Sequence, residues 1–532
     1  MTLRDHPVHA ATAISMANQG YLIWICGANN QTSCGDLRDS SITGRAHNPT
    51  LLVDCGKLLP MQQVADALKN LTDNTDNPLF TVLGDAFAAA GEELALVGGP
   101  VRDAIMGRRS IDLDFATSAN PDKILSIVGP LASATWDIGR AFGTIAAQIG
   151  DEKVEITSYR ADSYEVDSRK PTIEFGDNLE DDLKRRDFTV NSMALRLPSR
   201  IFVDPHQGLR DLLLETLRTP SAPEVSFSDD PLRMMRGARF ASQLGFELDP
   251  EAFAAMRGMA ERIDIISKER VRDELSKLLL SDNPIPGLEI LVDSGIAELV
   301  LPELPALRLE MDEHHHHKDV YQHSLTVVSQ AIELEAEYGL EKNLVLRLAA
   351  LLHDIGKPAT RRLETGGAVT FHHHDVVGAK LSKKRLSELR FDNDTIKAVY
   401  RLIELHLRFF GYSEQQWSDS AVRRYVRDAE AQLAQLHVLT RADVTTRNKR
   451  KADRLAHAYD DLEKRIAILG EQEQLDAIRP ELDGAQIMKI LEIKPGREVG
   501  LAYDYLLELR LDQGELGPEQ AKKLLLEWWS NR

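Results

Sequence analysis

The spacing of apolar and polar residues divides this chain into two kinds of region. Between Glu93 and about Leu197, short apolar runs typical of strands alternate with segments of helical spacing. The segment LALVGGPVRDAIMG has the pattern of a strand, a glycine turn and a helix, and IDLDFAT, AFGTIAAQIG and KVEITSYR are predicted to be strands. From about Leu209 onward the spacing is helical almost throughout, with one short strand pair expected around residues 360–370. The pattern predicts a small α/β domain followed by a long helical body.

The first sixty residues lack this regularity. They are rich in Asn, Thr, Ser and Gly, and helical spacing begins only at Met61. We expect residues 1–60 to be a disordered leader, or an upstream extension from a misassigned start. Cys26, Cys34 and Cys55 all lie in this segment, and because their spacing matches no common zinc pattern we expect three free thiols.

Length and charge narrow the class of protein. A chain of 532 residues is too long for one core, so several domains in series are expected. No run approaches the roughly 20 apolar residues that cross a bilayer, and the apolar stretch at residues 21–26 lacks the flanks of a signal peptide. The expectation is a cytoplasmic protein that has no membrane partner. The net charge of -19 argues against a surface that coats nucleic acid, although a local basic track remains compatible with it.

A glycine pair and two aspartates are the first candidate chemistry. Gly98 and Gly99 lie between a predicted strand and helix, where the backbone approaches a phosphate closely and the helix N-terminus favours negative charge. Asp112 and Asp114 are two apart on a predicted strand, so both carboxylates point to one face. Such a pair is unfavourable without a cation, and hard oxygen ligands suit Mg²⁺. Glu155, on another predicted strand, is the candidate third carboxylate for two-metal phosphoryl transfer.

These motifs, with RRDFTVNSMA, FVDPHQGLRD and SDDPLRMMR further on, resemble those of the polymerase β-like nucleotidyltransferases of the CCA-adding type. The closest resemblance is to the bacterial class II enzymes, shared with poly(A) polymerases, and among these to the actinobacterial type with an HD domain. The resemblance covers most of the chain after Met61, in family order. It implies an α/β nucleotidyltransferase head and an all-α neck and body, CTP and ATP as substrates, and a tRNA 3′ end as partner.

The resemblance also implies roles for residues outside the acidic pair. Residues implied to bind the incoming nucleotide are Gly98, Gly99, Arg102, Arg186, Asp187, Asn191 and Arg236. Asp230 and Arg233 match the pair that selects the base, and at i and i+3 we expect them on one face of a helix. An Asp accepts from the amine of cytosine or adenine, and an Arg donates to the neighbouring ring nitrogen. Uracil and guanine reverse both groups, so the pair would admit C and A.

A second set of residues resembles the H…HD…D ligands of HD-type metal phosphohydrolases. It consists of His323, His353, Asp354 and Asp443, which suit a divalent ion such as Ni²⁺, Mn²⁺ or Mg²⁺. His374 and His406 fall where HD domains with a fuller ligand set have further ligands. The run at residues 314–317 is native sequence of uncertain involvement. The resemblance implies hydrolysis of a phosphoester such as a 2′,3′-cyclic phosphate, and an unused HD scaffold is the alternative.

The expected domains are a leader (1–60), the nucleotidyltransferase head (61–200), a helical neck with an RNA- and nucleotide-binding segment (201–310), an HD domain (311–450) and a helical tail (451–532). Candidate tRNA-binding stretches are Lys268–Arg272, Lys380–Arg385, Arg423–Arg427 and Arg447–Arg454, each with a solvated helix face as its alternative. The predicted reaction is addition of CMP, CMP and AMP. The alternatives are a poly(A) polymerase or a CC- or A-adding enzyme, and a metal phosphohydrolase whose head only binds.

Overall fold

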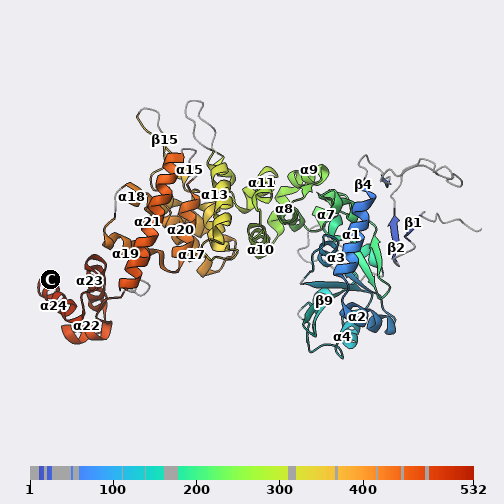
Figure 1. Cartoon of the computed structure of the whole chain (residues 1–532), viewed down its shortest axis with the longest axis horizontal. Helices are drawn as coiled ribbons and strands as arrows, with labels where there is room; N and C mark the ends of the chain where they lie inside the picture. The colour runs from blue at the N-terminus through green and yellow to red at the C-terminus, as the bar shows by residue number, and fades with distance from the viewer. Residues whose placement is uncertain are drawn as a thin grey trace, which may run out of the picture. The chain divides into compact units, whose positions relative to one another are not determined.

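The computed structural model (Figure 1) describes residues 11–16, 21–26, 50–51, 59–110, 112–137, 139–160, 178–308, 319–365, 369–414, 417–444, 449–473 and 479–532. The chain forms two compact units. The first is Met1–Arg270 with Pro286–Ile296, and the second is Val271–Ile285 with Ala297–Arg532. Within the described residues, no helix is both long enough and apolar enough to cross a membrane.

A mixed sheet organises the first unit. Its strands run in the order β1-β2-β11-β10-β5-β6-β9-β8-β7. The four strands predicted from the apolar runs are β5 (Leu94–Val97), β6 (Leu113–Thr117), β8 (Thr144–Ile149) and β9 (Glu152–Ser158). The sheet also contains β7 (Ala134–Trp136), β10 (Ala194–Leu197) and β11 (Ile201–Asp204), which the sequence pattern did not indicate.

Two strands lie within the segment that was expected to be a disordered leader. They are β1 (Ala11–Met16) and β2 (Tyr21–Cys26), which pair antiparallel, and β2 pairs parallel with β11. Two-residue strands β3 (Thr50–Leu51) and β4 (Leu59–Pro60) also pair. Apolar, β-branched and aromatic residues such as those of YLIWIC favour strand pairing. The assignment of residues 1–60 as a leader or an upstream extension stays a prediction. The other residues before 59, including Cys34 and Cys55, lie outside the described residues.

The two faces of the sheet carry different chemistry. Leu113 and Phe115 of β6 belong to the main core, which also contains residues of α1 (Met61–Asn74), α2 (Pro78–Ala89) and α4 (Pro121–Val128). Ala116 belongs to a smaller cluster that contains Leu179 and Leu183 of α5 (Leu179–Lys184). Because side chains alternate along a strand, Asp114 points to the same side as Ala116, away from the main core.

The other helices of the first unit carry its remaining motifs. They are α3 (Gly99–Ile105), α6 (Gly208–Leu213), α7 (Pro223–Asp229), α8 (Leu232–Leu244), α9 (Pro250–Met259) and α11 (Ile285–Asp293). A short parallel pair, β12 (Thr216–Leu217) and β13 (Glu247–Leu248), lies among them. Helix α10 (Lys268–Leu279) begins in the first unit and continues into the second.

The second unit is helical, as the spacing predicted. Its helices are α12 (Ala297–Val300), α13 (Val320–Glu335), α14 (Leu344–Leu352), α15 (Lys357–Thr360), α16 (His374–Glu388), α17 (Asn393–Leu405), α18 (Arg408–Glu414), α19 (Asp419–Ala429), α20 (Leu433–Ala442), α21 (Lys449–Glu473), α22 (Gly484–Leu491), α23 (Arg497–Gln513) and α24 (Pro518–Ser530). The expected strand pair is confirmed as β14 (Arg362–Leu363) and β15 (Val369–Thr370). Trp528 and Trp529 pack against the core of the last three helices.

Candidate active site and metal centre

Three carboxylates converge at the edge of two neighbouring strands. Asp114 on β6 lies directly opposite Glu155 in the parallel register with β9, and Asp112 immediately precedes β6. Burial raises the pKa of the Asp114 carboxyl, the charge of Arg186 opposes that rise, and the two neighbouring carboxylates add to it. Negative charge therefore accumulates at one point, as expected of a site that binds a cation.

The glycine turn lies beside Arg186. Gly98 has a φ of 73°, in the region that favours glycine, and Gly99 begins α3. A Cβ atom on Gly98 would meet Arg186 Nη1 at 2.8 Å. The missing side chain thus leaves room for the Arg186 guanidinium beside the turn. This arrangement offers a positive charge and main-chain N–H groups to a phosphate.

Four of the predicted nucleotide-binding residues form one hydrogen-bonded network. Arg102 Nη1 donates to Asn191 Oδ1 at 2.7 Å, and Asn191 Nδ2 donates to Asp187 Oδ1 at 3.0 Å. Arg236 Nε donates to Asp187 Oδ2 at 2.8 Å. Burial alone would raise the pKa of the Asp187 carboxyl, but the Arg236 charge and these hydrogen bonds hold it well below its usual range. Asp187 is therefore a fixed anion that orients its neighbours.

Asp230 is not on the helix that carries Arg233, so the expectation of one helical face is wrong. Asp230 has extended backbone angles (φ -142°, ψ 99°), and α8 begins two residues later. The cause is Pro231, because a residue that precedes proline is disfavoured in the helical region. Asp230 Oδ1 accepts from the main-chain N–H of Leu232 at 3.1 Å, and Oδ2 accepts from Arg270 Nη2 at 2.8 Å.

Arg233 has partners of its own. Its Nη1 donates to Ser226 Oγ at 2.9 Å and its Nη2 donates to the main-chain carbonyl of Arg185. The side chain is buried. In this state both residues of the predicted base-selecting pair are bound to protein groups, so reading a base requires their side chains to exchange these partners or to use remaining donors and acceptors.

The FVDPHQGLRD motif forms a buried turn between β11 and α6. Asp204 accepts from the main-chain N–H groups of Gly208 and Leu209 at 2.7 and 3.0 Å, at the start of α6. Burial raises the pKa of the Asp204 carboxyl to about 6, against the effect of those hydrogen bonds. A Cβ on Gly208 would lie 2.2 Å from the carbonyl oxygen of Thr189, so glycine is required there for close packing.

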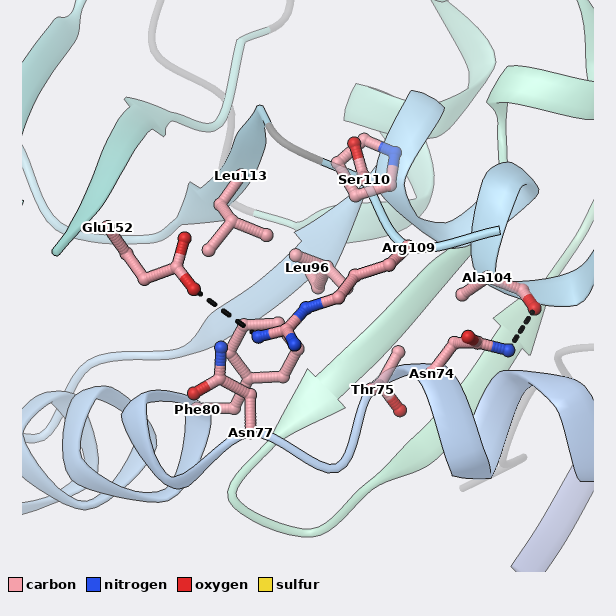
Figure 2. Close-up of a pocket in the computed structure, with 11 residues that line it drawn as sticks. Asn74, Thr75, Asn77, Phe80, Leu96, Ala104, Arg109, Ser110, Leu113 and Glu152 are labelled. Carbon is pink, nitrogen blue, oxygen red and sulfur yellow. Dashed lines mark hydrogen bonds and ion pairs between the residues drawn. The ribbon is translucent and has the colours of Figure 1, made fainter. Parts of the chain in front are cut away.

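A small pocket lies on the opposite side of β6 from the carboxylates (Figure 2). Core residues including Phe80, Leu96 and Leu113 line it, and Arg109 forms an ion pair with Glu152 across it at 3.5 Å. Its lining includes neither Asp112 nor Asp114. The pocket is thus not the place where the acidic pair acts.

In the second unit, the predicted metal ligands come together at helix ends. His323 is in the first turn of α13, whereas His353 and Asp443 follow the last residues of α14 and α20. His323 Nε2 lies 2.9 Å from Asp443 Oδ1 and 3.3 Å from His353 Nε2, and Asp354 Oδ2 lies 3.3 Å from His353 Nε2. Four residues from distant parts of the sequence therefore surround one point.

His374 and His406 join this cluster from α16 and the end of α17. His374 Nε2 lies 3.3 Å from Asp354 Oδ1, and the rings of His406 and His374 are 5.4 Å apart. The donor atoms form two groups of three, His323 with His353 and Asp443, and Asp354 with His374 and His406. We call these six residues the HD centre. The structure brings together all six residues that the sequence indicated as HD ligands or further ligands.

Hydrogen bonds fix the orientation of three of the imidazole rings in the HD centre. The Nδ1 atoms of His353, His374 and His406 lie 2.9, 2.8 and 2.6 Å from the carbonyl oxygens of Ala350, Phe371 and Ile403. A carbonyl only accepts, so each Nδ1 carries a proton and Nε2 is the ring atom that is left to bind a metal. This is the usual outer-shell arrangement of metal-binding histidines.

The buried charges of the HD centre call for a cation. Burial lowers the pKa of His406 to about 4, and its Nε2 is a buried atom without a hydrogen-bond partner among the described residues. Burial would also lower the pKa of His353, but the adjacent Asp354 and Asp443 raise it. Positive charge is therefore stabilised between these groups, and a divalent ion held by them would supply it in place of a proton. The donor set fits a divalent metal, whose identity the structure does not specify.

The basic stretches differ in what they contact. In Arg423–Arg427, Arg424 forms ion pairs with Glu508 and Asp512 of α23 at 2.8 and 2.7 Å, and Arg423 Nη1 donates to the carbonyl of Leu511. This stretch holds two helices together, which favours the structural alternative. Residues 447 and 448 lie outside the described residues, as do residues 314–317, whereas Lys449 and Arg450 are exposed.

Comparison with known proteins places these sites in a family. The family models that match are "Poly A polymerase head domain" at residues 94–218, "Probable RNA and SrmB- binding site of polymerase A" at 245–307 and "HD domain" at 320–448. The A-adding tRNA nucleotidyltransferase of Deinococcus radiodurans is 34% identical over 441 residues, covering 82% of this chain and 95% of that protein. The chain belongs to the tRNA nucleotidyltransferase family.

Other members match over different extents. The CC-adding tRNA nucleotidyltransferase of Thermus thermophilus is 31% identical and covers 82% of this chain and 94% of its own length. A CCA-adding enzyme of Streptococcus suis is 43% identical over 225 residues, covering 42% of this chain and 54% of its own length. The crystal structure of the Bacillus stearothermophilus CCA-adding enzyme in complex with CTP has a TM-score of 0.61 at 22% identity and covers 86% of this chain and 99% of its own. This tRNA nucleotidyltransferase thus shares that fold.

Proposed function

We propose that this tRNA nucleotidyltransferase adds CMP, CMP and AMP in turn to the 3′ end of tRNA and releases pyrophosphate. The observation that carries the proposal is the placement of Asp114 opposite Glu155, with Asp112 adjacent and with Arg186, which lies beside the Gly98 turn, acting electrostatically on Asp114. The names of the relatives add support, because each denotes addition of nucleotides of the CCA sequence.

The carboxylates Asp112, Asp114 and Glu155 fit Mg²⁺, since they offer hard oxygen donors at one point. When bound there, Mg²⁺ would lower the pKa of the attacking 3′ hydroxyl and neutralise the triphosphate. The chain's own groups position the substrates. Gly98 and Gly99 give main-chain room for the phosphates, Arg186 supplies a positive charge beside them, and Asp187 with Asn191 lies near the sugar.

Base selection is assigned to Asp230 and Arg233. A carboxylate that accepts from an exocyclic amine and a guanidinium that donates to a ring nitrogen together favour C and A over U and G. The tRNA would be held by the segment that matches the RNA-binding family model, residues 245–307, and by exposed basic residues such as Lys449 and Arg450 in the second unit.

Extension of a tRNA transcript that lacks its terminal CCA tests the proposal. Purified protein and Mg²⁺ are incubated with each triphosphate singly and then together, and products are resolved at single-nucleotide length. Growth by three nucleotides that needs both CTP and ATP supports it. A stop after two nucleotides even when both triphosphates are present would mean a CC-adding enzyme. Addition of a single AMP only to a second transcript that already ends in CC would mean an A-adding enzyme, and a long ladder with ATP alone would mean a poly(A) polymerase. No extension of either transcript would leave a phosphohydrolase whose head only binds.

We infer a second activity at the HD centre, hydrolysis of a phosphoester such as a 2′,3′-cyclic phosphate. Six converging donors with three oriented imidazoles support a working metal site over an unused scaffold. Ni²⁺, Mn²⁺ and Mg²⁺ are the candidate ions. Release of 2′- or 3′-nucleotide from a 2′,3′-cyclic nucleotide, measured with each ion after chelation, tests this activity. Absence of hydrolysis with every ion would favour the scaffold.

A further inference from the structure

Asp182 is a buried carboxylate that none of the motifs above includes. It lies on α5, its side chain is 1% exposed, and it accepts from two consecutive arginines. Arg185 donates to Oδ1 from Nε and Nη2 at 3.0 and 2.6 Å, and Arg186 donates to Oδ2 from Nε and Nη2 at 3.3 and 3.1 Å. Each carboxylate oxygen thus holds one guanidinium.

The two arginines lead to different parts of the candidate active site. Arg186 lies against Gly98 and acts electrostatically on Asp114, where the triphosphate and metal are expected. The main-chain carbonyl of Arg185 accepts from Arg233 Nη2, the arginine assigned to base selection. The Asp182 carboxylate therefore contacts both Arg186, which lies where the triphosphate is expected, and Arg185, whose main-chain carbonyl contacts the arginine assigned to base selection.

The stability gained from packing does not by itself explain why a charged residue is buried at position 182. Burying a carboxylate costs free energy, and a buried ion pair often contributes no more stability than apolar residues of similar volume. Burial would raise the pKa of the Asp182 carboxyl, but the charges of Arg186 and Arg185 hold that pKa below its ordinary value. The carboxylate is thus kept ionised, and its clearest effect is to fix the direction of two guanidinium groups.

We propose that Asp182 is a positioning residue for nucleotide addition, which holds Arg186 toward the triphosphate and, through Arg185, Arg233 toward the base. The proposal rests on the function proposed above. It predicts that loss of the Asp182 charge weakens nucleotide binding and base preference together, although Asp182 touches neither the phosphates nor the base.

The test compares Asp182→Asn, which keeps the size of the side chain and removes its charge, with Asp181→Asn, its exposed neighbour on α5. For Asp182→Asn we expect the KM for CTP to rise about tenfold or more, because small misplacements of binding groups have effects of this size. The preference for CTP over UTP should fall as well. Asp181→Asn should keep wild-type values for both. All rates are scaled to the folded fraction, measured by circular dichroism at the assay temperature.

A folded Asp182→Asn protein with the wild-type KM and CTP preference would overturn the proposal. So would a loss of rate that is equal for all nucleotides and matches the loss of folded protein, since that is the mark of a purely structural role. If Asp182→Asn does not fold, Asp182→Glu keeps the charge but displaces it. A raised KM with a reduced preference in that variant supports the proposal, and wild-type values contradict it.

Failure of the proposed function is distinguishable from failure of this inference. Wild-type protein that extends no tRNA would defeat the function. Calorimetric titration of CTP into wild type and Asp182→Asn still decides the role of Asp182, because the inference requires weaker CTP binding by the variant. Equal affinities would overturn it even in an active enzyme.

Discussion

In the head, Asp112 just before β6 and Glu155 on β9 are exposed carboxylates, whereas His353 and Asp354 of the HD centre are each 1% exposed. The exposure of two of the three carboxylates in the head suits a metal that arrives with a triphosphate and leaves with pyrophosphate, although Glu155 also accepts from Lys153 Nζ at 3.2 Å. The HD centre offers imidazole donors whose rings main-chain carbonyls already orient. Such a centre suits a metal that stays. We therefore expect the head to bind a metal together with its substrate and the HD centre to bind one in a preorganised site.

The largest effect should come from the head. Asp114→Asn keeps the shape of the side chain and removes the charge opposite Glu155, so we expect nucleotide addition to fall by about a thousandfold or more, roughly 4 kcal/mol in the barrier. Single-turnover extension of tRNA measures the loss. Asp122→Asn, an exposed aspartate on α4, is the control. A fall of less than about tenfold would show that Asp114 is not a metal ligand.

The HD centre should lose metal affinity when one ligand is removed. His374→Ala should retain less metal after dialysis than wild type, with an affinity weaker by about tenfold or more, because even outer-shell changes have effects of that order. Elemental analysis of the protein measures it, and His372→Ala, an exposed histidine nearby, should retain the wild-type amount. Equal metal content in all three proteins would contradict a six-donor centre.

Base selection provides a second difference between the two sites. In the head, the side chains of Asp230 and Arg233 must exchange protein partners for the base or use their remaining donors and acceptors, whereas three imidazole rings of the HD centre are already oriented. Asp230→Asn replaces an acceptor with an amide that can also donate, so it tolerates the carbonyl of uracil. We expect the CTP-over-UTP preference to fall by about tenfold, or about 1.4 kcal/mol. Competition between the two triphosphates in the extension assay measures it. An unchanged preference would assign base selection to other residues.

The last effect is on stability rather than on activity, and it concerns Asp204, a buried carboxylate of the head whose hydrogen bonds come from main-chain N–H groups. The pKa of Asp204 is raised to about 6, whereas Arg236 holds that of Asp187 below its usual range. An acid with a raised folded pKa contributes most to stability below its unfolded pKa of about 3.9, and this contribution is lost as pH rises through about 6. Relative to Asp204→Asn, wild type should therefore lose about 1–3 kcal/mol between pH 4 and pH 7. Urea unfolding at both pH values measures it, and the opposite trend would contradict burial as the cause of the raised pKa.

The sequence predicted the structure correctly where the residues of the candidate site lie within a regular apolar–polar pattern. The strand bearing Asp114 alternates in apolar and acidic residues, which gave both the strand and the face of its carboxylate. The four-residue strands β10 and β11 were missed because they are short and joined by a tight turn at Leu197–Arg200, where local pattern is weak. Asp230 was placed on a helix although Pro231 signalled otherwise, so that error was avoidable.

Other features depend on the fold and had no local signal. Asp182 sits in a run of acidic residues that looks like an exposed helix face, and only the packing of α5 buries it. The partners of the basic stretch Arg423–Arg427 come from α23, more than eighty residues away. Spacing identified the HD ligands, but the carbonyls that orient them became visible only in three dimensions.

The two proposed metal sites should act separately. Measuring tRNA extension and 2′,3′-cyclic nucleotide hydrolysis side by side in Asp112→Ala and His353→Ala tests this. We expect Asp112→Ala to abolish extension and keep hydrolysis, and His353→Ala to do the reverse. Loss of both activities from either folded variant would contradict two independent sites.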